Sequence, residues 1–414
     1  MKKRIYHDIT VIGGGPAGIM AALSSSFNNK DVCIIEGNER IGKKILITGD
    51  GKCNLTNRVM RDENFHSSNK RFFKSVLKQF SNKDTIKFFD KLGLITTILD
   101  DGRVYPISFQ ASSVLDILRF ALDENHISII TNFRVSDIKK IKNVFEIIDS
   151  LGNIVESKKV ILACGGKAAP FTGSDGSGYD LAINLGHKII NPMPSLVQLK
   201  LNFQGLRGLA GVRFEGDAEI YVDGYSEGKA HGEILFTNYG VSGPAILKLS
   251  RIASIELQRK RRVSVKINLL PKFNSAQIKE ILKKYIDQHF NRSIWNIFIG
   301  LINKKVIPIL LKDAGLENIH KSAGKMTHSD LRSIVQHLTE WQFEISGTLS
   351  FKDAQVTTGG VDTRDVDPST LESRIVKCLY FAGEVLDVDG DSGGYNLQWA
   401  MSSGWVSGIS AGKK

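Results

Sequence analysis

The sequence of 414 residues predicts an α/β fold, in which a β-rich insertion and a helical segment interrupt a first α/β domain. Near the N-terminus an apolar run passes through a glycine triplet into helical spacing, which predicts the α/β domain. Glycine-broken β-type runs over 195–270 predict the insertion, and a helical period over 275–340 predicts the helical segment. Because the chain is too long for one ordinary core, we expect two or three domains.

The N-terminal strand, turn and helix span Ile5 to Leu23. An apolar run leads into Gly13-Gly14-Gly15-Pro16-Ala17-Gly18, after which apolar residues recur at helical spacing. In a Gly-x-Gly-x-x-Gly turn, the first glycine permits the turn, the second lets the backbone approach a pyrophosphate, and the third lets helix and strand pack closely. Gly13, Gly15 and Gly18 have this spacing. The pattern predicts a Rossmann-type site in which a helix N-terminus faces an anion.

A second apolar run, Val32 to Ile35, ends in Glu36. A carboxylate at the tip of the second strand is placed to accept hydrogen bonds from ribose hydroxyls and would repel a 2′-phosphate. A lone glycine triplet is weak evidence, but here strand, helix, second strand and acid occur in register. We therefore predict a dinucleotide that contains ADP rather than a structural glycine turn.

The segment from Gly42 to Asn57 is rich in Gly, Thr, Asn and Lys. This composition favours a loop with many hydrogen-bond donors over a strand or a helix. Such a loop would lie along a pyrophosphate or a flavin ring, and the alternative is an ordinary surface loop. For Cys53, within this segment, we expect the small apolar role of most free cysteines rather than nucleophilic catalysis.

The middle of the first domain is predicted to mix helices and short strands. Residues 66–93 have the apolar spacing of one amphipathic helix or two, and Ser113 is expected to cap a further helix. Short β-type runs from Ile127 to Ile161 indicate an antiparallel excursion within a dinucleotide domain.

The run from Val160 to Gly166 predicts a buried strand that ends in small residues. Such an ending at Gly165 leaves room for a ligand over the sheet edge. Gly176-x-Gly178 is not a second nucleotide fingerprint, because no strand leads into it and the third glycine is missing. One dinucleotide fold is therefore expected.

Composition changes set the expected domain boundaries. Pro192 and Pro194 mark the first boundary, and Pro244 is expected near the first turn of a helix in the insertion. We expect the dinucleotide domain over 1–190 and 353–414, the β-rich domain over 191–272 and about 341–352, and the helical subdomain over 273–340.

Near the C-terminus the chain is predicted to return to the dinucleotide domain. A short buried strand ends in Gly383-Glu384, a position suited to a ribityl chain, and Ser392 to Ala400 opens a helix of small residues over Ala400 to Ala411. The N-terminus of this helix would direct N–H groups at the cofactor and stabilise negative charge on a reduced isoalloxazine. Because the first and last motifs would hold one extended cofactor, FAD is favoured over a diffusible NAD.

The composition indicates a soluble, globular, cytoplasmic protein, with 42% hydrophobic and 24% charged residues and no apolar run of membrane-spanning length. The formal charge of +12 and the run Arg259 to Arg262 raise a nucleic-acid alternative. A basic bias alone supports only non-specific attraction, so we expect a solvated surface and no nucleic-acid or membrane partner. The four cysteines form no Cys-x-x-Cys pair, which argues against a zinc site and a vicinal redox disulfide.

Motifs along the whole chain resemble those of the bacterial YhiN/BaiN-like flavoproteins, described as NAD(P)/FAD-dependent oxidoreductases or aminoacetone-oxidase-like enzymes. The motifs that carry the resemblance are Gly13 to Gly18, Lys43-Lys44-Ile45 through Lys52 to Asn57, Gly102 to Pro106, Leu235-Phe236-Thr237 with Ser242-Gly243-Pro244, Val356 to Val361, and Gly383 to Asp387 through Gly393 to Gln398.

The resemblance implies a glutathione-reductase-like FAD domain, a β-rich insertion, a helical third domain and tightly bound FAD. The ADP half would be held by Gly13, Gly15, Ala17, Gly18 and Glu36. The rest of the cofactor would be held by Lys44, Asn54, Gly383, Asp389, Gly394, Asn396, Leu397 and Gln398; Pro16, Gly165 and Glu384 complete the expected set. Two departures are visible: Asn238 stands where we expect His, and Lys52 where many members carry Arg. An amide cannot shuttle a proton as imidazole does.

These observations predict an FAD-dependent oxidoreductase that acts on a small organic substrate. The resemblance brackets two reactions: oxidation of an amine or amino-ketone, and reduction of a double bond conjugated to a ketone, with NAD(P)H as a transient reductant left open. The alternatives are a flavin-dependent RNA-modifying enzyme and a non-catalytic flavoprotein. Tyr395 and Asn54 are the groups expected nearest the ring, where cofactor packing is favoured over proton transfer. Catalytic residues, substrate and oligomeric state stay open.

Overall fold

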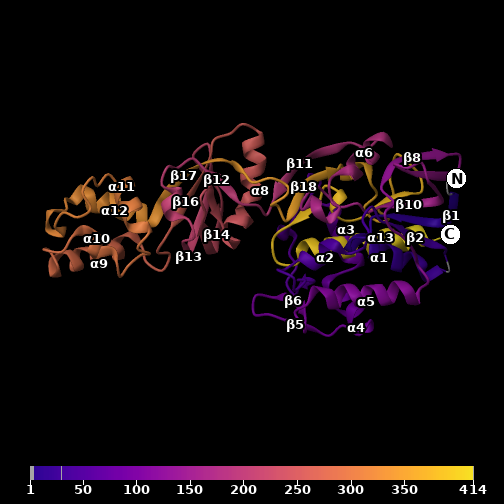
Figure 1. Ribbon diagram of the computed structural model, residues 1–414, viewed down its shortest axis with the longest axis horizontal. Coiled ribbons are helices and arrows are strands. Elements are labelled where there is room, and N and C mark those ends of the chain that lie inside the picture. The colour runs from indigo at the N-terminus through magenta and orange to yellow at the C-terminus, as the bar shows by residue number, and fades with distance from the viewer. Residues whose placement is uncertain (1–3, 29, 414) are drawn as a thin grey trace. The chain divides into compact units, whose positions relative to one another are not determined.

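The computed structural model describes residues 4–28 and 30–413, which form two compact units (Figure 1). Unit 1 consists of the described residues up to Pro194 and from Ala354 onward, and unit 2 runs from Ser195 to Asp353. No helix within these described ranges is long and apolar enough to cross a membrane.

Unit 1 is built on a seven-stranded sheet in the order β7-β2-β1-β10-β9-β8, with β19 also paired to β10. Strands β7, β2, β1, β10 and β19 are parallel, whereas β8, β9 and the first half of β10 form an antiparallel meander. The strand bounds are β1 Arg4–Ile12, β2 Val32–Ile35, β7 Ser128–Ile130, β8 Val135–Ile141, β9 Val144–Asp149, β10 Ile154–Leu162 and β19 Leu379–Phe381. The carboxyl ends of the parallel strands therefore share one edge of the sheet.

Two helices from opposite ends of the chain, α1 (Pro16–Ser25) and α13 (Tyr395–Gly412), run side by side in unit 1 (Figure 1). A Cβ at Gly404 would lie 2.3 Å from the carbonyl oxygen of Ala17, and one at Gly408 would lie 2.2 Å from that of Ala21. Side chains at these two positions would push the helices apart, so the small residues of α13 are needed for close packing.

Three helices begin or divide at positions that the sequence did not specify correctly or fully. Helix α13 begins at Tyr395 and not at Ala400, because Gly394 has φ of 100° and acts as its N-cap. Helix α5 (Ala111–Glu124) has Gln110 as its N-cap, so the expectation that Ser113 caps it is wrong. Residues 66–93 form two helices, α3 (Phe72–Gln79) and α4 (Asn82–Lys91), and the side chain of Ser81 caps the second.

Shorter elements complete unit 1. The predicted loop after β2 begins with a short helix, α2 (Lys43–Ile47), before it becomes irregular. A helix and several short strands complete the unit: α6 Ser177–Asn184, β3 Thr56–Asn57, β4 Phe65–His66, β5 Thr96–Ile98, β6 Arg103–Pro106, β11 Ile189–Ser195, β18 Val356–Val361 and β20 Asp389–Gly390.

Unit 2 is a closed six-stranded barrel, in the order β12-β15-β14-β13-β16-β17, that carries a group of helices. The strands are β12 Leu199–Leu201, β13 Arg213–Val222, β14 Tyr225–Phe236, β15 Gly240–Ser242, β16 Val263–Asn268 and β17 Trp341–Thr348; the helices are α7 Leu206–Leu209, α8 Pro244–Gln258, α9 Ser275–Gln288, α10 Ile294–Phe298, α11 Val306–Asp313 and α12 His328–Glu340. Barrel and helices share one hydrophobic core cluster, with Phe236 and Trp341 among its largest buried residues. The α/β fold with a β-rich insertion is thus confirmed.

Candidate functional site

The glycine turn lies between β1 and α1, where its three glycines have different surroundings. Gly13 has φ of 110°, and a Cβ there would lie 2.5 Å from the carbonyl oxygen of Ala163. A Cβ at Gly18 would lie 1.8 Å from the carbonyl oxygen of Gly13, so helix and strand touch there. A Cβ at Gly15 would have no atom within 4 Å. Open space therefore lies in front of α1, where an anion meets the helix N-terminus.

Glu36 directly follows β2 and points back at the glycine turn. Its Oε2 accepts a hydrogen bond from the backbone N–H of Gly14 at 2.9 Å. Its Oε1 accepts from the backbone and side-chain N–H groups of Asn38 at 2.8 and 2.7 Å. The carboxylate is half-buried at the carboxyl edge of the sheet, where the ribose is predicted to lie.

Gly383 brings the last motif of the chain to the first. A Cβ at Gly383 would lie 2.7 Å from the Cβ of Ala17, the second residue of α1. The backbone N–H of Gly383 donates to Oγ of Ser403 at 2.8 Å, and its carbonyl accepts from Nε1 of Trp399 at 3.1 Å. Both partners lie on α13, so the beginning of α1, the end of β19 and helix α13 meet at one place.

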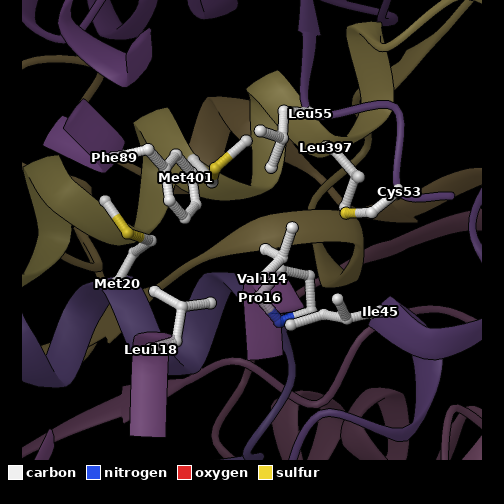
Figure 2. Close-up of a pocket in the computed structure, with 10 residues that line it drawn as sticks. All are labelled: Pro16, Met20, Ile45, Cys53, Leu55, Phe89, Val114, Leu118, Leu397 and Met401. Carbon is white, nitrogen blue, oxygen red and sulfur yellow. The ribbon is translucent and has the colours of Figure 1, made fainter. Parts of the chain in front are cut away.

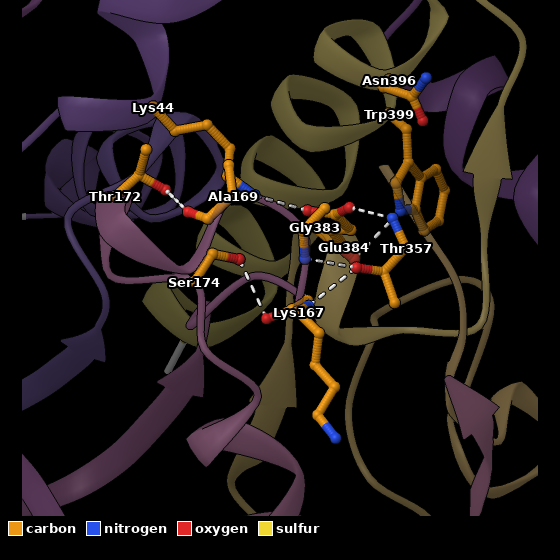
Figure 3. Close-up of polar contacts among 12 residues, drawn as sticks. Lys44, Lys167, Ala169, Thr172, Ser174, Thr357, Gly383, Glu384, Asn396 and Trp399 are labelled. Carbon is orange, nitrogen blue, oxygen red and sulfur yellow. Dashed lines mark hydrogen bonds and ion pairs between the residues drawn. The ribbon is translucent and has the colours of Figure 1, made fainter. Parts of the chain in front are cut away.

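An ion pair joins α2 to the segment after β19 (Figure 3). Nζ of Lys44 lies 3.0 Å from Oε2 of Glu384, and both side chains are about four-fifths buried, with relative exposures of 20% and 19%. The backbone N–H of Thr357, on β18, donates to Oε1 of Glu384 at 2.6 Å. Lys44 and Glu384, two residues predicted for the cofactor site, are thus in direct contact.

The loop after β10 packs against the same threonine. Oγ1 of Thr357 accepts the backbone N–H groups of Lys167 and Ala168 at 2.8 and 2.9 Å (Figure 3). A Cβ at Gly165 would lie 2.6 Å from Oγ of Ser174. The room predicted for a ligand at Gly165 is therefore occupied by a side chain of this loop.

Asn54 is a buried residue with an unsatisfied acceptor. It is 9% exposed, and its Oδ1 has no hydrogen-bond partner within the described residues. A Cβ at Gly394 would lie 2.9 Å from this oxygen, so Oδ1 faces the residue that caps α13. A buried acceptor without a donor costs about 1–3 kcal/mol, so the site suits a ligand that brings an N–H group.

The other residues predicted from the C-terminal motif form hydrogen bonds within the protein. Asn396 accepts the backbone N–H of Gly390 at 2.8 Å and donates to its carbonyl at 2.7 Å. Asp389 accepts the hydroxyl of Thr358 at 2.7 Å. Gln398 is fully buried; its Oε1 accepts the hydroxyl of Thr56 at 2.6 Å, and its Nε2 donates to Ser402 at 2.9 Å. These side chains shape the turn before α13, and direct contacts with a cofactor stay a prediction.

A small apolar cavity is lined by side chains from α1, α4, α5 and α13, among others (Figure 2). Pro16 and Leu397, both predicted for the cofactor site, line it together with Met20, Ile45, Cys53, Leu55, Phe89, Val114, Leu118 and Met401. Burial raises the pKa of the Cys53 thiol to about 12. Cys53 is therefore a protonated apolar side chain at neutral pH, which is a poor nucleophile.

Tyr395 is the first residue of α13 and packs edge-on against Phe65, with ring centroids 5.8 Å apart. Burial raises the pKa of its phenol, so the hydroxyl is protonated at neutral pH. Its expected position near a flavin ring stays a prediction.

Sequence patterns missed two features of this region. Thr357 joins the loop after β10 to Glu384, and His66 pairs with Asp391 beside α13. The chain separation of each pair, from 27 to 325 residues, hides these contacts from local spacing. Within the described part of the chain, no group of three or more His, Cys, Asp or Glu residues could hold a metal ion.

The structural features fit FAD. Open space lies at Gly15 in front of one helix, and an orphaned acceptor of Asn54 lies at the beginning of a second helix. Lys44 pairs with Glu384, whose neighbour Gly383 contacts the beginning of α1. An extended cofactor with a pyrophosphate and a ring N–H matches this order of groups. Fold and site together define a dinucleotide-binding α/β flavoprotein.

The model of the family described as "HI0933-like protein Rossmann domain" matches residues 7–410, and the chain belongs to that family. It is 37% identical over 410 residues to a 3-dehydro-bile acid delta(4,6)-reductase of Clostridium scindens, which covers 98% of this chain and 99% of the relative. The chain is an FAD-dependent oxidoreductase.

Two further relatives are named ribosomal RNA dihydrouridine synthase. The protein of Escherichia coli is 31% identical over 96% of each chain, and that of Haemophilus influenzae is 29% identical over 99% of each chain. Both likenesses extend over essentially the whole length, so they include the insertion as well as the dinucleotide domain.

Proposed function

We propose that the protein reduces a carbon–carbon double bond conjugated to a carbonyl group in a small organic molecule. The observation that carries this proposal is the full-length likeness to a bile acid delta(4,6)-reductase. That name describes reduction of double bonds in a ring system, and the motifs of the predicted FAD site extend from Gly13 to Gln398 in this chain. Oxidation of a small amino-ketone has no comparable support among these relatives.

In this proposal the cofactor is FAD, which when bound supplies two-electron chemistry to a conjugated acceptor. The turn Gly13, Gly15 and Gly18 with Pro16, Ala17 and Glu36 would hold its ADP half. Lys44 and Glu384 would exchange their mutual ion pair for contacts with the pyrophosphate and ribityl chain. Asn54 would accept an N–H group of the ring, and the N-terminus of α13 would stabilise negative charge there. Gly383 would border the site at the beginning of α1 and Gly165 at the end of β10. The ring end would be shaped by Asp389, Gly394, Asn396, Leu397 and Gln398.

The number of dinucleotide folds indicates how a nicotinamide donor would bind. The described residues contain one glycine turn of this type between a parallel strand and a helix, so no separate domain is left for a nicotinamide. We propose that NADH or NADPH is the electron donor and docks transiently.

The experiment is an anaerobic visible spectrum of the purified protein, recorded before and after NADH and NADPH are added in turn. We expect a flavin spectrum that one nucleotide bleaches and that a conjugated ketone restores. A flavin that neither nucleotide reduces would contradict a nicotinamide-driven reductase. Protein that carries no flavin even after reconstitution with FAD would contradict the proposal as a whole.

The second candidate function is reduction of a uracil base in RNA. It is favoured by the names of the two relatives at 29% and 31% identity. The chemistry is the same, because the base also has a carbon–carbon double bond conjugated to a carbonyl. The structure weakens the case that the basic run Arg259 to Arg262 binds phosphate, because Arg259 and Arg261 both form ion pairs with Glu256.

RNA binding with a steep salt dependence would separate this candidate from the first. The measurement is binding of a fluorescent RNA hairpin at several salt concentrations, with dihydrouridine content as the second readout. Binding that is absent at low salt would exclude the RNA candidate and leave the small-molecule reductase.

A further inference from the structure

A histidine–aspartate pair that no motif predicted lies beside the beginning of α13. Strand β4 pairs antiparallel with β20, which brings His66 close to Asp391, and Nε2 of His66 is 2.8 Å from Oδ1 of Asp391. The side-chain amide of Asn64 donates to Oδ2 at 3.2 Å, and the backbone N–H of Asp391 donates to the carbonyl of Asn64 at 2.9 Å. The carboxylate is therefore held on both sides, with one oxygen directed at the imidazole.

The pair is attached to the turn that leads into α13. Nδ2 of Asn396 donates to the carbonyl of Gly390 at 2.7 Å and to that of Asp391 at 3.2 Å. Asn396 lies in the first turn of α13 and was predicted for the cofactor site. The same side chain therefore connects the position of Asp391, and through it His66, to the end of α13 that would face the ring.

His66 has one fixed and one available ring nitrogen. Nδ1 has no hydrogen-bond partner within the described residues, and the side chain is 29% exposed, so water reaches it. An imidazole oriented through one nitrogen by a carboxylate, with its other nitrogen free, is the arrangement of general acids and bases.

We propose that His66 donates the proton that completes reduction of the conjugated double bond, and that Asp391 is its positioning residue. The proposal rests on the proposed function. Addition of a hydride equivalent to the β carbon, with both electrons drawn from the reduced cofactor, moves the π electrons onto the carbonyl oxygen. The Nδ1–H bond of the imidazolium then breaks, its proton forms the new bond at the α carbon, and the nitrogen keeps the electron pair. Solvent returns a proton to His66.

The first test compares His66→Gln with wild type in the anaerobic reoxidation of dithionite-reduced flavin by cyclohex-2-enone and by a 3-oxo-4-ene steroid acid. His7→Gln is the matched control, because His7 pairs with Asp31 at 3.0 Å near the amino end of β1, at the opposite edge of the sheet. We expect His66→Gln to slow reoxidation by the ketone about a hundredfold and to leave reoxidation by oxygen unchanged. Equal rates with the ketone in His66→Gln and wild type would overturn the proposal.

The second test does not require turnover. The ring-proton NMR signal of His66, assigned by its loss in His66→Gln, is recorded in FAD-loaded protein with the flavin oxidised and then reduced. We expect the chemical shift of His66 to change on reduction, because the charge of a cofactor beside the ring changes, while the signal of His7 stays unchanged. An unchanged His66 signal would overturn its placement beside the cofactor. A wild-type flavin that no conjugated ketone reoxidises would contradict the proposed function and the proton transfer, even if the His66 signal moves.

Discussion

At the scale of single residues, the glycines of the first turn differ in whether packing requires them. Gly18 is required by the fold, because a Cβ there would meet the carbonyl of Gly13 at 1.8 Å. Gly15 is not, since a Cβ there would enter open space with an extended backbone that any residue adopts. Packing therefore does not require a glycine at position 15, and we propose that a ligand does.

This difference makes a paired prediction. Gly15→Ala should leave the thermal unfolding of the FAD-free protein unchanged and weaken FAD binding about tenfold or more, because the new methyl group takes the place of the pyrophosphate. Gly18→Ala should lower the free energy of unfolding by about 2 kcal/mol or more through overpacking. Calorimetry and titration with FAD measure both effects. Full FAD affinity in Gly15→Ala would show that the cofactor does not approach this turn.

Burial of the Cys53 thiol predicts how the free energy of unfolding depends on pH. The pKa of Cys53 in the folded protein is about 12, above the value of about 8.5 for a free thiol. A group whose pKa is raised by folding stabilises the protein fully below the unfolded value, and this contribution is lost as the pH rises toward the folded value. The free energy of unfolding, measured with urea, should therefore fall as the pH rises from about 8 to about 10.5. In Cys53→Ala this fall should be smaller by about 2 kcal/mol. An identical loss in both proteins would contradict the buried, protonated thiol.

Residue spacing could predict only contacts that are local or belong to a known turn. Gly13, Gly15, Gly18 and Glu36 were found because strand, turn and acid follow each other in the sequence. The ion pair of Lys44 with Glu384 spans 340 residues, and neither side chain carries a local signal of its partner. For the same reason the pairing of His66 with Asp391 emerged only from the strand pairing of β4 with β20.

At the scale of elements, helix α13 holds the two ends of the chain together. Its glycines face the carbonyls of α1, and its first turn carries Asn396 beside the turn at Gly390. The helix predicted over Ala400 to Ala411 begins five residues earlier in the structure, at Tyr395. Gly394 caps the helix, so its N-terminus lies next to Asn54.

Close packing of α13 on α1 predicts a helix-specific effect. In Gly408→Ala the new methyl group would lie 2.0 Å from Oγ of Ser24, so the helices must move apart, and we expect a loss of about 2–3 kcal/mol in the free energy of unfolding. FAD affinity should fall with it, because both helix N-termini are displaced. Ser410→Ala, in the same helix and half-buried, is the control and should change neither. Urea unfolding that gives equal stability for both variants would refute the packing account.

At the scale of the whole molecule, the fold class was predictable and the closure of the barrel was not. Alternating and glycine-broken runs indicated strands in unit 2. The pairing of β17 with β12 and β16, however, depends on packing between distant segments, because four α-helices separate even β16 from β17. The site shows the same division. Its glycine turns were visible in the sequence, whereas the network that joins Lys44, Glu384 and Thr357 required the folded chain.

The central claim is that a bound flavin passes electrons to a conjugated double bond. It is tested most directly by reducing the FAD-loaded protein anaerobically and recording the visible flavin spectrum after a 3-oxo-4-ene steroid acid is added, with the saturated steroid as control. The account predicts that the oxidised spectrum returns only with the unsaturated compound, in step with formation of the saturated product. A reduced flavin that persists in the presence of this steroid, of cyclohex-2-enone and of uridine-containing RNA would contradict it.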